Sequence, residues 1–295
     1  MNGNWQTVAA DISRHTQTPI EIRHQQSVSG GCINQCWELT DQSQTKWFVK
    51  TNRPELSDMF IAEAQGLQEI INTQSVRAPQ PVCYGKTASF SYLVLEHIPL
   101  KTLKNQALAG KQLAQMHFVS RQQNNLFGWK RDNTIGSTPQ PNKQQHDWVK
   151  FWREERLLFQ LKLAHSKGLP TTTFDKGLLL AERLDTFFNQ SPQASLVHGD
   201  LWGGNCATDA QGNPVIFDPA VYYGDRETDL AMTELFGGFN ADFYAAYQAV
   251  YPLDDGYETR KVLYNLYHIL NHYNLFGGGY GSQAGSMIDQ LLAQT

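Results

Sequence analysis

Two aspartates and an asparagine are spaced in a way that suits one kind of chemistry. Asp200 and Asn205 lie in the run HGDLWGGN, and Asp218 follows an apolar stretch 18 residues after Asp200. The D-x4-N spacing, with a second acid on the next strand, is typical of enzymes that transfer the γ-phosphoryl group of ATP. One carboxylate orients the attacking hydroxyl, while an amide and another carboxylate hold Mg²⁺. The sequence therefore predicts a phosphotransferase that uses ATP and Mg²⁺.

Each of these residues also has a structural interpretation. A lone Asp200 would most often be a turn residue after a strand, and Asn205 could be a turn residue after two glycines. When Asp200 and Asn205 are considered together with Asp218, the catalytic interpretation is favoured over the structural one. We expect Asp200 to accept the proton of the substrate hydroxyl, and Asn205 and Asp218 to bind the metal. His198 is expected to brace the loop by hydrogen bonding rather than to act as a base.

Residues upstream of this run could bind the nucleotide. Ser29, Gly30 and Gly31 lie between two predicted strands, where backbone N–H groups can approach phosphates without a Cβ clash. Gly-Gly is also an ordinary hairpin turn. Lys50 ends a predicted strand and Glu63 lies on the next predicted helix, which suits a phosphate-binding lysine and its ion-pair partner. The alternative is a solvated lysine and a surface glutamate. The chain has no GxxxxGK[ST] motif, which disfavours a P-loop NTPase.

The adenine ring is expected to bind at the end of the last strand before the composition changes. Glu96 and Ile98 are the candidates there, by position alone. Adenine recognition at such a hinge uses backbone C=O and N–H groups, so the side chains carry little information.

The composition limits the class of protein. The chain has 295 residues, 41% of them hydrophobic and 18% charged, with a net charge of -4. These values are ordinary for a globular protein, and no basic run suggests a nucleic-acid partner. No apolar run approaches the roughly 20 residues of a membrane span, and the start does not resemble a secretory signal. We therefore expect a cytoplasmic protein with neither nucleic acid nor membrane as partner.

The four cysteines do not suggest a disulfide scaffold. Cys32 and Cys36 lie on one predicted strand, where four residues place Cα atoms roughly 13 Å apart, beyond the ~7 Å limit for a bridge. An intrachain bond is therefore not expected. Cys32, beside the glycines, could instead link two chains on oxidation, which is a hypothesis.

The elements that must position these residues fall into two parts. Residues 1–97 contain a helix around Trp5 and Ile12, a main helix over residues 58–73, and five strands. The predicted strands are 20–25, 32–39, 46–50, 82–85 and 92–97. Residues 98–295 are mainly helical, with short strands at 196–197 and 215–217 and an ordered loop over 124–142. The predicted helices are 106–117, 148–166, 176–188, 228–235, 241–250 and 260–275. The fold class is thus α+β with two lobes.

Several segments carry a resemblance to a known family. They are residues 138–142, 198–205, 217–220, 222–227, 229–232, 235–239 and 270–277. The Gly-Asp-Arg-Glu sequence at 224–227 is far more specific than the D-x4-N pattern. In these segments, and over nearly its whole length, the chain resembles the fructosamine (ketosamine) kinases. It has Gly203 where that family commonly has Ser.

The resemblance implies a protein-kinase-like fold, close to those of aminoglycoside and choline kinases. It implies Mg-ATP-dependent phosphorylation of a sugar hydroxyl on ketoamine adducts of amines, and a part in protein deglycation is one reading of that activity. Trp202 could stack on the sugar or pack in the core. Asp225 could meet a substrate amine, although Asp225, Glu227 and Asp229 more often cap a helix. The alternatives are an aminoglycoside- or choline-type kinase and a non-catalytic nucleotide-binding module.

Overall fold

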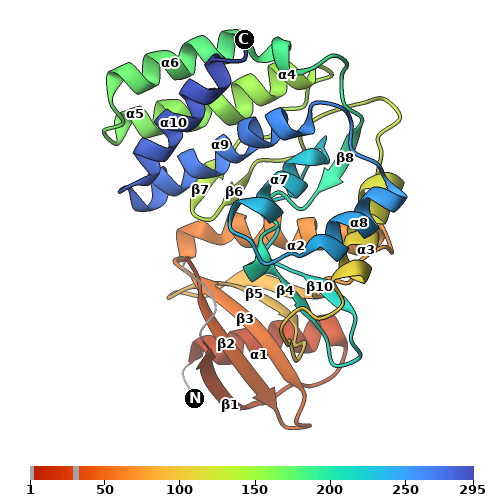
Figure 1. Cartoon of the computed structure of the whole chain (residues 1–295). Coiled ribbons are helices and arrows are strands. Elements are labelled where there is room, and N and C mark those ends of the chain that lie inside the picture. Colours follow the sequence, from red (N-terminus) through yellow and green to blue (C-terminus); the bar gives the residue numbers. More distant parts are fainter. Residues whose placement is uncertain (1–2, 29–32) are drawn as a thin grey trace. The chain divides into compact units, whose positions relative to one another are not determined.

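The computed structural model describes residues 3–28 and 33–295, which pack as two compact units (Figure 1). The first unit consists of Met1–Asn105 with Ala207–Asp218, and the second of Gln106–Cys206 with Pro219–Thr295. A single division between residues 97 and 98 would place Asp218 in the second part. In the structure the chain returns to the first unit over Ala207–Asp218, so Asp218 is held there.

A five-stranded antiparallel sheet forms the first unit, with strand order β1-β2-β3-β5-β4. The first three strands form the predicted meander. The strands are β1 (Ile22–Val28), β2 (Gln35–Asp41), β3 (Lys46–Asn52), β4 (Pro81–Lys86) and β5 (Ser91–Glu96).

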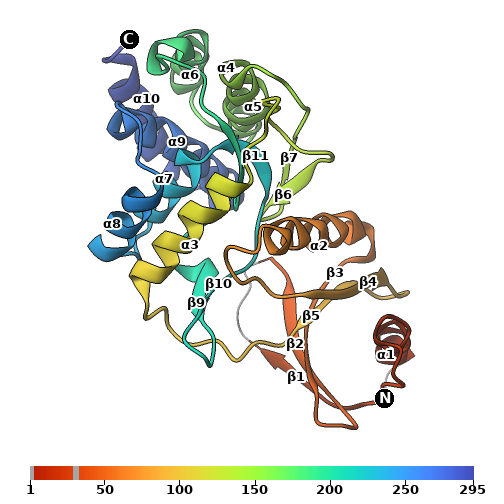
Figure 2. The same cartoon turned by 90° about the vertical axis from the view of Figure 1, so that its right-hand side faces the viewer.

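The two α-helices of this unit cover opposite faces of the sheet (Figure 2). Helix α1 (Gly3–Thr16) buries Trp5 and Ile12 against sheet residues that include Val49. Successive strand residues point to opposite faces, so Lys50 points to the other face, where α2 (Ser57–Asn72) lies. A short 3₁₀ turn, η1 (Pro54–Leu56), precedes α2.

The returning segment of the first unit contains a two-stranded sheet of β9 (Cys206–Thr208) and β10 (Pro214–Ile216). Backbone bridges join Thr208 to Lys101 and Val215 to Arg77. Asp218 follows β10 by two residues, so these bridges hold it to the first unit.

The second unit is mainly helical and is built around α9 (Tyr257–Phe276), which packs against α5, α7 and α10. Its other α-helices are α3 (Gln106–Val119), α4 (Trp148–Phe151), α5 (Leu158–Ser166), α6 (Thr171–Glu182), α7 (Glu227–Leu235), α8 (Ala241–Val250) and α10 (Tyr280–Leu292). A π-helical turn, η2 (Trp152–Leu157), joins α4 to α5, and 3₁₀ turns occur at η3 (Leu184–Phe187) and η4 (Gly203–Asn205). Across the described part of the chain, no helix has the length and apolar character needed to span a membrane.

Two small sheets lie beside these helices. Strand β8 (Ala194–Val197) pairs with β11 (Tyr222–Asp225), and β6 (Asn133–Ile135) pairs with β7 (Thr138–Gln140). The β6–β7 hairpin is tied to the segment after Asp218, because Gln140 Nε2 donates to Ala220 O at 2.9 Å and Asn133 Nδ2 donates to Val221 O at 2.8 Å.

Most predicted elements are present, and several differ from the prediction. Strand β9 was not predicted, and the π-helical turn η2 interrupts the helix predicted over 148–166. The expected loop at 124–142 contains the β6–β7 hairpin, and β11 was not predicted. Helix α6 covers Thr171–Glu182 where 176–188 was predicted. It ends earlier because the 3₁₀ turn η3 takes the place of its predicted end. Helix α10 was also missed, since Gly281 and Gly285 lower its helix propensity, but it buries Ala284, Ile288 and Leu291.

Candidate active site

In the first unit, one lysine joins two carboxylates that come from distant parts of the sequence. Lys50 on β3 donates from Nζ to Glu63 Oε1 of α2 at 2.6 Å, and it also contacts Asp218 Oδ1. The side chains of Lys50 and Glu63 are 4% and 10% exposed. The structure therefore contains the ion pair predicted between Lys50 and Glu63. It adds the contact with Asp218, which the sequence did not indicate.

Burial and charge act in opposite directions on this cluster. Burial alone would lower the pKa of Lys50, but the carboxylates of Asp218 and Glu63 outweigh it and raise that pKa above its usual value. Burial raises the pKa of Glu63, and the Lys50 cation opposes this effect. Lys50 is thus a firmly protonated cation in a buried place, which suits a residue that binds phosphate oxygens.

Asp218 has an unusual backbone conformation. Its φ angle is +58°, in the left-handed region, which residues other than glycine seldom adopt, although Asp tolerates it better than most. Such strained residues are often found at functional sites. The carboxylate at this position is one third exposed, so it remains open to a ligand.

In the second unit, the loop after β8 positions Asp200 and Asn205. Asn205 Nδ2 donates to the backbone carbonyl of Asp200 at 2.9 Å, and Asn205 N donates to Trp202 O at 2.9 Å within η4. The backbone N–H of Asp200 points to His198 Nδ1 at 3.3 Å. His198 is fully buried, so its side chain braces the loop as expected. Because the amide nitrogen of Asn205 is engaged, its carbonyl oxygen is the atom that could bind a cation.

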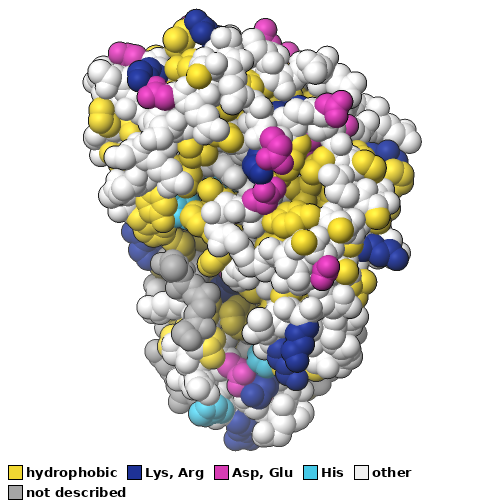
Figure 3. Space-filling view, viewed as in Figure 1, with side chains coloured by type: hydrophobic (Ala, Val, Ile, Leu, Met, Phe, Trp, Pro, Cys, Tyr) yellow, Lys and Arg dark blue, Asp and Glu magenta, His cyan; other side chains and the backbone are white. Residues whose placement is uncertain are grey.

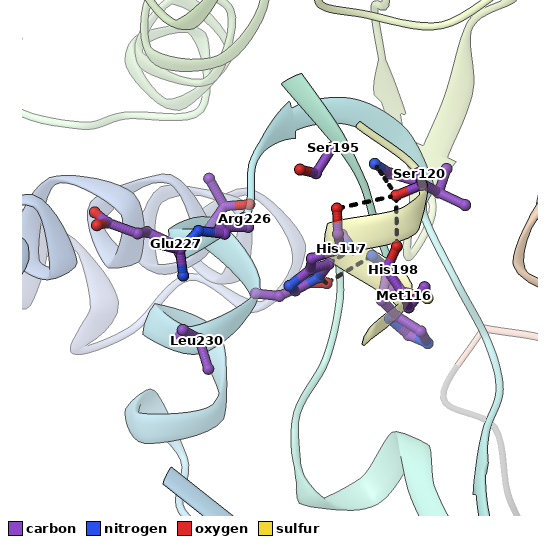
Figure 4. Close-up of polar contacts among 12 residues, drawn as sticks. Met116, His117, Ser120, Ser195, His198, Arg226, Glu227 and Leu230 are labelled. Atoms are coloured by element: carbon purple, nitrogen blue, oxygen red, sulfur yellow. Dashed lines mark hydrogen bonds and ion pairs between the residues drawn. The ribbon is translucent and has the colours of Figure 1, made fainter. Parts of the chain in front are cut away.

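A buried carboxylate on α7 anchors this loop, a role that the sequence analysis missed. Asp229 Oδ2 accepts from His198 N at 2.7 Å, and Oδ1 accepts from Gly199 N at 2.8 Å. His117 Nε2 on α3 lies 3.1 Å from Asp229 Oδ2, and His117 Nδ1 lies 2.8 Å from Tyr247 OH. Figure 4 shows His117 and the neighbouring Ser120 beside His198.

The electrostatics of Asp229 agree with this anchoring role. Burial would raise the pKa of Asp229, but the hydrogen bonds from His117 and from the Gly199 backbone lower it below its usual value. Asp229 is thus a buried carboxylate that stays ionised because several groups donate hydrogen bonds to it. Gly199 itself has a φ of +81°, and a Cβ there would collide with the Ala220 carbonyl, so only glycine fits.

The N-cap residue of α7 is Arg226, which makes no side-chain capping hydrogen bond, and of the three acids only Asp225 accepts from a backbone N–H at the start of this helix. Asp225 Oδ1 accepts from Glu227 N at 3.0 Å, as a capping side chain does, and its Oδ2 accepts from Tyr264 OH. Glu227 does not cap the helix, because it pairs with Arg260 through both of its carboxylate oxygens. Asp229 binds the loop instead. Asp225 is buried among these partners, which does not favour contact with a substrate amine.

The other predicted nucleotide-binding residues are only partly described. Ser29, Gly30, Gly31 and Cys32 lie outside the described residues. The backbone N–H of Glu96 donates to Gln80 O at 2.9 Å, and its side chain pairs with Arg77 at 2.6 Å. Glu96 could therefore bind adenine only through its carbonyl. Ile98 is buried.

Trp202 lies in the loop after β8, and its side chain is at the surface. Its side chain is 40% exposed and meets the ring of Phe236 edge to face, with centroids 6.4 Å apart. The loop backbone at Gly203 packs against Gly238, where an added Cβ on Gly203 would lie 3.0 Å from the Gly238 Cα. Gly203 therefore allows a close approach of two backbones.

Comparisons with known proteins extend these observations. The family model for fructosamine kinase matches residues 4–294. The chain is 48% identical over 292 residues to a probable ketoamine kinase of Synechocystis sp., covering 98% of this chain and 97% of that protein. It is 45% identical to the chloroplastic protein-ribulosamine 3-kinase of Arabidopsis thaliana, covering 90% and 82%. The crystal structure of a candidate fructosamine-3-kinase from Haemophilus somnus has a TM-score of 0.91 at 31% identity, covering 98% of both chains.

Proposed function

Because the chain belongs to the fructosamine kinase family, we propose that it transfers the γ-phosphoryl group of ATP to a sugar hydroxyl of ketosamines. The observation that carries this proposal is the family match over residues 4–294, in a chain that retains Lys50, Asp200, Asn205 and Asp218. Phosphorylation of sugar adducts on amines fits a part in protein deglycation. The intact residues disfavour a non-catalytic nucleotide-binding module.

In this proposal, Asp200 accepts the proton of the attacking hydroxyl. Its loop is held by Asp229 and His198, so the carboxylate is presented by a backbone with fixed hydrogen bonds. Phosphoryl transfer depends mainly on such positioning and on charge stabilisation. Asp200 is partly exposed, as a group that meets a substrate must be.

Lys50 is proposed to bind the α- and β-phosphates of ATP, with Glu63 holding its ammonium group. Asn205 and Asp218 are proposed as Mg²⁺ ligands. Both offer hard oxygen atoms of the kind that Mg²⁺ prefers, and Asn205 presents its carbonyl oxygen because its amide nitrogen is engaged. The metal would neutralise charge on the transferred phosphoryl group.

The acceptor is tested by ATP consumption over a panel of compounds. Ribuloselysine and fructoselysine represent the ketosamines, and choline and an aminoglycoside represent the acceptors of related kinases. We expect ADP release with at least one ketosamine and none above background with the other two. ADP release with choline or the aminoglycoside alone, or with none of the four compounds, would contradict the proposal.

The comparison of the two ketosamines also identifies the preferred sugar. The relative from Arabidopsis thaliana is called a protein-ribulosamine 3-kinase, which supports ribuloselysine as the first compound to test. A matched reaction without acceptor measures ATP hydrolysis by water and is subtracted.

A further inference from the structure

The second unit carries an exposed group of aromatic side chains next to the catalytic loop. Trp202, Phe236 and Phe276 are 40%, 40% and 57% exposed. His272 connects them, since its ring centroid lies 4.8 Å from that of Phe236, 5.7 Å from Phe276 and 5.1 Å from Tyr280. We call these five residues the aromatic surface. Figure 3 shows hydrophobic side chains around a histidine over the end of α9 and the start of α10.

The backbone holds this surface in place. Phe236 precedes Gly237 and Gly238, and Gly238 packs against Gly203 in the same loop that carries Trp202. His272 Nδ1 lies 2.8 Å from the backbone carbonyl of His268, one turn earlier on α9. A carbonyl can only accept, so Nδ1 carries the proton and Nε2 presents a lone pair. These contacts hold the backbone beside Phe236 and Trp202 and set the orientation of the His272 ring.

The chemistry of the surface suits an amine carried on an apolar stem. None of its five side chains is a carboxylate, lysine or arginine, and burial lowers the pKa of His272, so its ring is neutral near pH 7. Faces of neutral aromatic rings attract ammonium groups and cover methylene chains.

We propose that the aromatic surface binds the amine-bearing arm of the acceptor, namely the methylene stem and secondary ammonium of a lysine-linked ketosamine. The inference rests on the proposed function and deepens it. Trp202 follows Asp200 by two residues, so an acceptor whose sugar hydroxyl meets Asp200 would extend its arm along the neighbouring rings. The surface would thus favour lysine adducts over the same sugar carried on a small amine.

Two acceptors that share one sugar test this selectivity. The first is the ribulose adduct of the lysine side chain, and the second is the ribulose adduct of methylamine, which lacks the stem. We expect Phe236→Ala and Phe276→Ala to raise KM for the lysine adduct by about 3- to 30-fold, with kcat within about 2-fold. KM for the methylamine adduct should change by less than about 2-fold, because that acceptor reaches fewer of the rings.

A matched variant controls for the loss of any exposed aromatic ring. Phe118 on α3 is 43% exposed and packs on Arg121 and Tyr251 outside the aromatic surface. Phe118→Ala is expected to leave both KM values unchanged, and thermal unfolding of all three variants checks that they fold.

The outcomes separate the two proposals. Equal increases of KM for both adducts, a fall in kcat alone, or no change in the two surface variants would overturn the role of the aromatic surface while the kinase activity stands. A wild-type protein that phosphorylates neither adduct would overturn the proposed function itself, and this inference with it.

Discussion

At the scale of single residues, the cluster of Lys50, Glu63 and Asp218 explains how a cation can persist in a buried place. A lone buried lysine tends to lose its proton, because desolvation disfavours the charged form. Two carboxylates reverse that tendency here. Phosphate oxygens can then bind a fully charged ammonium group, and the hydrogen bond to Glu63 sets the position of that group.

Replacement of Glu63 by glutamine tests this arrangement. Glutamine keeps the size of the side chain, and Lys50 retains Asp218 as a partner. We expect KM for ATP to rise about 10-fold, because the ammonium group loses one of its two anchors. The free energy of unfolding should change by less than about 2 kcal/mol, since the substitution also removes a costly buried charge. Steady-state kinetics and urea denaturation measure the two effects.

The control is Asp58→Asn, which replaces an exposed acid on the same helix. It should leave KM for ATP unchanged. A Glu63→Gln variant with the wild-type KM would show that the Lys50–Glu63 pair does not position the nucleotide.

At the scale of elements, α7 and the end of α3 hold the loop after β8 in addition to the hydrogen bonds within the loop itself. Asp229 holds two consecutive backbone N–H groups of the loop, and His117 holds Asp229. Leu196 in β8 donates its N–H to Ser120 Oγ at 3.0 Å, which adds a second link to the region of α3. The position of Asp200 is therefore set by residues far away in sequence.

Asp229→Asn should weaken catalysis through this loop. An amide offers one acceptor oxygen in place of two, so one of the N–H groups of His198 and Gly199 loses its partner. We expect kcat to fall by about 10- to 100-fold, KM for ATP to stay within about 2-fold, and the free energy of unfolding to drop by about 3 kcal/mol.

The matched control is Asp289→Asn on α10, whose exposed ion pair with Lys176 should be worth less than about 1 kcal/mol.

Because the pKa of Asp229 is lowered from its usual 3.8, its carboxylate stabilises the fold above that pH. The stability difference between wild type and Asp229→Asn should accordingly shrink as the pH falls below 3.8. An undiminished kcat in Asp229→Asn would contradict the anchoring role.

Much of the fold could be predicted because local patterns specify it. The periodicity of Trp5 and Ile12 and the strand alternation around Lys50 depend on neighbours in sequence. The spacing of residues 198–218 likewise reveals the chemistry. Asp229 could not be assigned, since an acid in the first turn of a helix usually caps it, and only tertiary packing shows that it binds the loop. Its one sequence signal is the apolar run at 230–232, which indicates a buried helix.

At the scale of the whole molecule, α9 makes stability depend on pH. This helix buries polar side chains in the core of the second unit, and burial lowers the pKa of His268 to about 3. Between pH 6.5 and about 3, the unfolded chain binds a proton at this residue that the folded chain does not. Stability must therefore fall as the pH falls through this range.

His268→Gln should flatten that dependence. The wild type is expected to lose about 1.4 kcal/mol per pH unit from this residue below pH 6.5, and the variant should lose correspondingly less between pH 6.5 and 5.5. Urea denaturation at several pH values measures the slope. His24→Gln, which changes an exposed histidine on β1, serves as the control. Equal slopes of the unfolding free energy against pH in wild type and His268→Gln would contradict the conclusion that His268 causes this dependence.

The central claim is that Asp200 accepts the proton of a ketosamine hydroxyl as that hydroxyl receives the γ-phosphoryl group of ATP. The direct measurement follows a radiolabelled γ-phosphoryl group from ATP into ribuloselysine or fructoselysine, with wild type and Asp200→Asn at equal ATP occupancy. We predict labelled ketosamine with the wild type, and a rate at least about 100-fold lower with Asp200→Asn. Label that reaches no ketosamine, or transfer by Asp200→Asn at the wild-type rate, would contradict the claim.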